Sequence, residues 1–145
     1  MGIITIARGT YSYGQEIAEK VAQELGWECI SREVILETSE EYNIPEIKLT
    51  RAFENAPSIL DRFTHGKKKY IAYVRAILLQ HLKKGNVVYH GFAGHFFVEG
   101  ISHVLKILIT ANMEDRISLV KERDNISRKE AALLINRLDD QRRRW

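Results

Sequence analysis

The first 25 residues join an apolar strand, a glycine-containing loop and an amphipathic helix without a linker between them. Residues 3–7 are mostly β-branched, which favours a strand. Gly9 and Gly14 bracket the loop, and apolar side chains then recur at helical spacing up to Gly26, a typical helix stop. A strand that leads straight into a helix begins a βαβ unit, so this segment predicts a parallel sheet with helices packed on it.

The rest of the chain continues this alternation of short apolar runs and helical patterns. Asn112 and the capping box Ser127-x-x-Glu130 predict where the last two helices begin. We expect an α/β fold, a parallel sheet flanked by helices, in a single domain over residues 1–145. The other predicted elements are strands at 27–30, 86–90 and 104–110 and helices at 46–53, 58–63, 68–84 and 113–123.

The composition points to a cytoplasmic protein. It has 45% hydrophobic and 28% charged residues, a single cysteine that cannot form an internal disulfide, and no apolar run long enough to cross a membrane. The net charge of +3 includes basic clusters at 67–69 and 142–144, which we interpret as solvated helix ends. The sequence therefore does not favour a membrane or nucleic-acid partner.

The loop after the first strand keeps the glycine spacing of the phosphate-binding motif GxxxxGKS/T. Gln15 stands where the motif has lysine, and Glu16 stands where it has the hydroxyl that binds magnesium. Backbone N–H groups at the start of a helix attract anions even without the lysine. The candidate phosphate-binding residues are Gly9, Thr10, Tyr11, Ser12, Tyr13, Gly14, Gln15 and Glu16.

A second interpretation treats this loop as a tight strand-to-helix connection that uses glycine only for its backbone freedom. Tyr11 and Tyr13 are bulky for a loop that wraps around a phosphate, which favours this interpretation. No metal site is predicted from the residues, because the spacing of His90, His95 and His103 matches no zinc pattern.

Several segments, in order along the chain, resemble the cytidylate kinase-like family. Residues 4–8 followed by Ser12-x-Gly14-x-Glu16 are similar to the start of its members, and residues 31–35 resemble a second segment of the family. Residues 57–60 resemble a proline-serine element, and residues 105–116 resemble the LKIFLTASxExR stretch of cytidylate kinases. Asp139 and Arg142 match the family's D-x-x-R lid motif.

The resemblance implies a three-layer P-loop NTPase-like fold of the nucleoside monophosphate kinase type, with a helical insertion at about 38–66 and a lid region at about 124–145. It also implies ATP and Mg²⁺ as cofactors and transfer of the ATP γ-phosphate to a nucleoside monophosphate. Arg116 and Arg142 are then the candidate catalytic residues, and Arg8 and Arg32 are candidates for binding the substrate.

The departures from the family keep a noncatalytic alternative open. Gln15 carries no charge where family members keep lysine or arginine, and residues 90–94 contain no arginine where relatives read GRD, GRG or GRC. Ser31 replaces an aspartate. These losses favour a degenerate kinase fold that serves as a ligand-binding or oligomerisation module.

A strand and a helix that follow the lid in the family have no counterpart in this sequence. We expect either a truncated chain or a free sheet edge that is covered by a second copy, giving a homo-oligomer. A nucleotide or another phosphate-bearing small molecule is the expected ligand.

Overall fold

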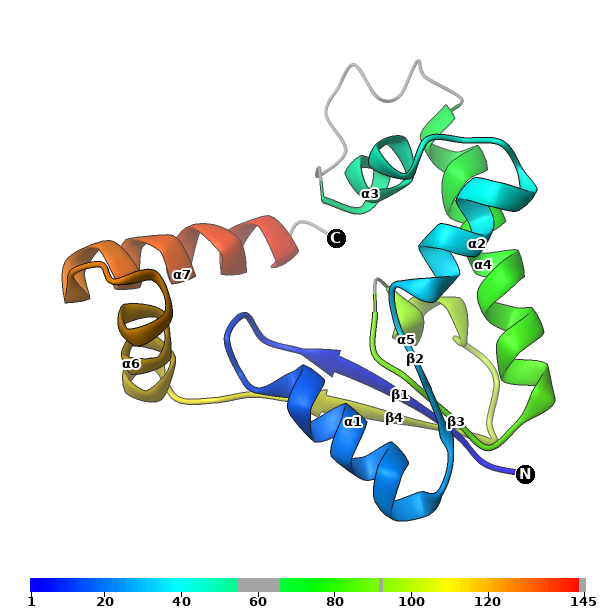
Figure 1. Cartoon of the computed structure of the whole chain (residues 1–145), viewed down its shortest axis with the longest axis horizontal. Helices are drawn as coiled ribbons and strands as arrows, with labels where there is room; N and C mark the ends of the chain where they lie inside the picture. Colours follow the sequence, from blue (N-terminus) through cyan, green and yellow to red (C-terminus); the bar gives the residue numbers. More distant parts are fainter. Residues whose placement is uncertain (55–65, 92, 144–145) are drawn as a thin grey trace.

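The computed structural model describes residues 1–54, 66–91 and 93–143. Four parallel strands form one sheet in the order β2-β3-β1-β4 (Figure 1). They are β1 (Ile3–Arg8), β2 (Glu28–Ile30), β3 (Val87–Tyr89) and β4 (Val104–Ile109). The central strand β1 aligns Ile3 with Val87 on one side and with Val104 on the other. The predicted α/β fold class is confirmed.

One face of the sheet is covered by α1 (Gly14–Leu25). The small side chains of Ala18 and Ala22 are buried against Ile4, Ile6 and Val88, so the helix lies close to the strands. Gly26 ends the helix with a positive φ of 65°, as the sequence predicts.

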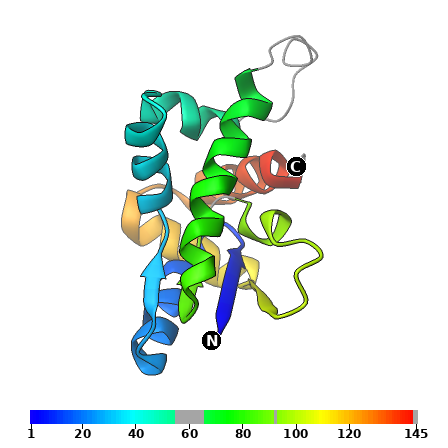
Figure 2. The same cartoon turned by 90° about the vertical axis from the view of Figure 1, so that its right-hand side faces the viewer.

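The opposite face carries the larger core. Leu49, Val74 and Leu78 are fully buried there with apolar residues of β1 and β3. Figure 2 shows α4 in front of the sheet, with α2 and α3 beside it. The helices on this face are α2 (Glu33–Glu41), α3 (Glu46–Glu54), α4 (Gly66–Lys84) and the short α5 (Gly94–Phe97), which sequence patterning misses because one turn has no periodicity.

The last two helices form a separate pair with a small core of their own. Ile117, Val120, Ala131 and Ile135 are buried between α6 (Met113–Asp124) and α7 (Arg128–Arg143). Both predicted caps are present: the Asn112 side chain accepts from the backbone N–H of Asp115 at 2.8 Å, and the Ser127 N–H donates to Glu130 Oε2 at 2.9 Å. In Figure 1 this pair lies beside the tip of the loop between β1 and α1.

The predicted helix at 58–63 and the proline-serine element at 57–60 lie outside the described residues. No helix in the described part of the chain is long and apolar enough to span a membrane.

Candidate functional site

The loop between β1 and α1 presents a row of unpaired backbone donors. Tyr11 and Tyr13 adopt left-handed conformations with φ of 56° and 57°, so the chain turns sharply into α1. Among the described residues, none accepts a hydrogen bond from the backbone N–H groups of residues 10–16. No side chain caps α1 either. Alternating conformations with free N–H groups at a helix N-terminus form an anion-binding concavity.

The two glycines of the motif differ in the space that surrounds them. A Cβ on Gly14 would lie 2.4 Å from Cβ and 2.8 Å from Cδ of Arg8, so only glycine lets the Arg8 side chain cross the start of α1. A Cβ on Gly9 would meet its nearest neighbour at an ordinary 3.7 Å. The positive φ angles fall on the tyrosines rather than on either glycine.

Tyr11 points toward the helix pair, which accounts for its size. Its ring packs against the core of α6 and α7, and the Arg123 guanidinium lies 4.7 Å from the ring centroid. Arg123 also donates to the Tyr11 hydroxyl at 3.1 Å. The bulk of Tyr11, which favoured a simple connection in the sequence, therefore anchors the loop to α6. Tyr13 is exposed.

The hydroxyl groups of the loop are buried. Ser12 Oγ donates to the carbonyl of Gly9 at 2.8 Å and lies 3.4 Å from the carbonyl of Ile109. Thr10 Oγ1 has no hydrogen-bond partner among the described residues. The first contact of Ser12 closes the loop on itself, and the second fixes the loop to the end of β4.

Gln15 and Glu16 project from the exposed surface of α1. Gln15 Nε2 donates to Glu19 Oε1 at 2.8 Å, along the helix rather than toward the loop. Glu16 replaces the hydroxyl of the motif, and the Ser12 hydroxyl is bonded to backbone carbonyls. The residues present thus do not reproduce the hydroxyl ligand for magnesium. In the described ranges, no group of three or more His, Cys, Asp and Glu side chains is placed to hold a metal ion.

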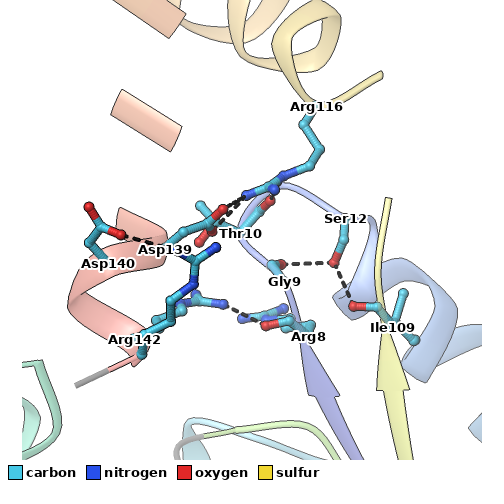
Figure 3. Close-up of polar contacts among 10 residues, drawn as sticks. Arg8, Gly9, Thr10, Ser12, Ile109, Arg116, Asp139, Asp140 and Arg142 are labelled. Carbon is cyan, nitrogen blue, oxygen red and sulfur yellow. Dashed lines mark hydrogen bonds and ion pairs between the residues drawn. The ribbon is translucent and has the colours of Figure 1, made fainter. Parts of the chain in front are cut away.

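Two arginines from the helix pair reach the loop (Figure 3). Arg116 donates from Nε to the Thr10 carbonyl at 2.8 Å, and its Nη2 lies 2.7 and 2.8 Å from the two carboxylate oxygens of Asp139. Arg142 donates from Nη1 to the carbonyl of Arg8 at 2.6 Å. Burial and the nearby positive charge of Arg8 lower the pKa of Arg142. The two candidate catalytic residues are therefore together at the loop, and their catalytic role stays a prediction.

The two candidate substrate residues are separated. Arg8 ends β1 and lies against Gly14 at the loop. Arg32 precedes α2 and pairs with Glu46 at the start of α3, its Nε 3.0 Å from Glu46 Oε1. Within the described ranges, no hydrogen bond or ion pair joins Arg32 to the loop.

His90 belongs to this region, although its spacing from His95 and His103 in the sequence bears only on metal binding. It is buried directly after β3, and its Nδ1 has no partner in the described part of the chain. Burial and the charge of Arg8 lower its pKa, while Glu19, Glu33 and Glu16 act in the opposite direction. The sequence indicates this location by one feature: His90 follows a predicted parallel strand, and the carboxyl ends of such strands meet at the same edge of the sheet as the loop after β1.

The comparisons with known proteins agree with this arrangement. A family model described as "Cytidylate kinase-like family" matches residues 3–145. No curated protein matches the chain. The crystal structure of an uncharacterized protein from Eubacterium ventriosum is similar with a TM-score of 0.69 and 15% identity, over 98% of this chain and 73% of that one.

A second solved structure, TT1252 from Thermus thermophilus, is similar with a TM-score of 0.50 and 19% identity, over 99% of this chain and 85% of that one. Identities this low show the fold alone. The family model, in contrast, covers nearly every residue, including the loop, the insertion and the helix pair. The chain therefore belongs to the cytidylate kinase-like family.

Proposed function

We propose that this protein binds a nucleotide through its phosphate groups, at the loop formed by residues 9–16. The observation that carries the proposal is the row of backbone N–H groups at residues 10–16, none of which has an acceptor among the described residues. Buried or half-buried N–H groups normally find a partner, and an oligophosphate chain supplies several acceptor oxygens at once.

The charges around the loop support the same ligand class. Arg8, Arg116 and Arg142 converge there, and Asp139 is bonded to Arg116 (Figure 3). The excess of positive charge attracts an anion, and guanidinium groups match phosphate oxygens in geometry.

Calorimetric titration with ATP, CMP and inorganic triphosphate tests this proposal. We expect the nucleotides to bind with a heat of binding that depends on the length of the phosphate chain. Adenosine and cytidine should bind much more weakly. Equal affinity for nucleoside and nucleotide, or no binding of either, would contradict phosphate recognition.

A second candidate function is phosphoryl transfer from ATP to a nucleoside monophosphate. Arg142 favours it, because a side chain from α7 that reaches the loop is suited to neutralise charge on a transferring phosphoryl group. In this reaction an acceptor phosphate oxygen forms a bond to Pγ, the bond from Pγ to the bridging oxygen of ADP breaks, and ADP leaves.

Turnover with ATP and CMP, UMP and related monophosphates distinguishes the two candidates. Product formation that requires magnesium supports the kinase. Nucleotide binding without turnover and without magnesium dependence supports the noncatalytic ligand-binding module, which agrees with Gln15 and Glu16 at the two altered positions.

A further inference from the structure

Arg8 runs across the start of α1 at the place where the loop donors begin. Its Cβ, Cγ and Cδ lie 2.4, 3.2 and 2.8 Å from the position that a Cβ on Gly14 would occupy. The aliphatic part of Arg8 therefore rests on the first residue of the helix, and glycine at position 14 makes this contact possible. A cation at this end of α1 adds to the positive end of the helix dipole, so the position is suited to a bound anion.

In the part of the chain that the structure describes, no side chain or carbonyl accepts a hydrogen bond from the Arg8 guanidinium, and no acid pairs with it. Arg116 and Arg32, by contrast, pair with Asp139 and Glu46. Arg142 adds a second positive charge beside Arg8, and it donates a hydrogen bond to the Arg8 carbonyl.

Burial first, and then the neighbouring charge of Arg8, lower the pKa of Arg142, while Asp139 acts in the opposite direction. A negative charge bound between the guanidinium groups of Arg8 and Arg142 would relieve their repulsion. Gln15, at the usual cation position, is bonded to Glu19 on the surface of α1.

We propose that Arg8 is the phosphate-binding cation of this loop and that it supplies, from the end of β1, the charge that position 15 lacks. The inference rests on the proposed function and names the residue that carries recognition. The ligand class is a chain of adjacent phosphate groups, because the planar guanidinium can bond two oxygens at once.

Calorimetric titration with inorganic triphosphate tests the proposal on the wild type, Arg8→Met and Arg75→Met. Methionine keeps an aliphatic chain over Gly14 and removes the charge. We expect Arg8→Met to weaken binding roughly ten- to hundredfold, as for loss of a charge-assisted hydrogen bond. Arg75→Met is the matched control and should bind within about twofold of the wild type, because Arg75 is an exposed arginine on α4, on the face of the sheet opposite α1.

The outcomes separate this inference from the proposed function. If the wild type does not bind triphosphate, the proposed function itself fails. If the wild type binds and Arg8→Met binds equally well, or Arg75→Met loses as much affinity, the assignment to Arg8 is wrong.

Thermal unfolding without any added anion distinguishes a binding role from a structural one. Because no side chain pairs with the Arg8 guanidinium, Arg8→Met should unfold at the wild-type temperature or above it. A midpoint lower by more than about 3 °C, together with lost binding, would assign Arg8 to the stability of the fold and overturn the proposal.

Discussion

Arg116 and Asp139 form a pair in which Nη2 of the arginine lies 2.7 and 2.8 Å from the two carboxylate oxygens (Figure 3). The Arg116 side chain is 11% exposed and that of Asp139 is 20% exposed. Because Nε of Arg116 also donates to the carbonyl of Thr10, a single guanidinium connects α6, α7 and the loop. The position of the helix pair is thus coupled to the conformation of the loop.

Asp139→Asn should lower the free energy of unfolding by about 2–3 kcal/mol, because it leaves the mostly buried charge of Arg116 without a counter-ion. Urea denaturation measures this change. Glu114→Gln is the matched control, since it breaks the ion pair between Arg128 and Glu114, whose side chains are 63% and 65% exposed. We expect no measurable loss in the control. Equal losses in both variants would contradict the coupling.

Gly14→Ala should destabilise the protein by about 1–3 kcal/mol, because the added methyl group would overlap the Arg8 side chain. It should also weaken phosphate binding by displacing Arg8. Gly9→Ala has room for its methyl group and should change the free energy of unfolding by less than about 0.5 kcal/mol. Chemical denaturation of the two variants side by side checks the difference, and an effect of Gly9→Ala as large as that of Gly14→Ala would refute it.

His90 should make the stability depend on pH below about 6.5. Its pKa is lowered from 6.5, first by burial and then by Arg8, so the unfolded chain takes up a proton more readily than the folded protein. The free energy of unfolding is then highest above pH 6.5 and falls as the pH decreases toward the lower pKa of the folded state. The negative charges of Glu19, Glu33 and Glu16 raise the pKa of His90 and therefore make this pH dependence smaller.

Urea denaturation at pH 7.5 and 5.5 measures this dependence. His90→Gln should show a smaller loss between the two pH values than the wild type. His95→Gln is the second variant. Its loss of stability between the two pH values should also be smaller than that of the wild type, because burial and Lys106 lower the pKa of His95 as well. A pH dependence unchanged by His90→Gln would rule out this histidine as a source.

The fold could be predicted from the sequence because its signals are local. Asn112, the Ser127–Glu130 box and the stop at Gly26 each act within a few residues, and the structure has all of them. The strand β2 was weakly signalled because it is only three residues long.

The side-chain contacts within the candidate site could not be predicted from the sequence in the same way. Arg116 meets a carbonyl 106 positions away, and Arg142 meets one 134 positions away, so these contacts exist only after the sheet and the helix pair have assembled. The role of Tyr11 was obscured for the same reason, because its partners belong to α6.

We expect the predicted homo-oligomer to form at one of the two edges of the sheet, the strand β4. In the described sheet β4 pairs only with β1, and its Leu105 and Leu108 are 57% and 67% exposed. An unpaired edge with apolar side chains is suited to a second β4 from another copy, joined antiparallel about a two-fold axis. We expect Leu108→Lys to shift the protein toward monomer in light scattering after gel filtration. Ile47→Lys, at an equally exposed apolar position on α3, should leave the molar mass unchanged. A wild type that is monomeric over the whole concentration range, or an Ile47→Lys variant that dissociates equally, would show that β4 is not the interface.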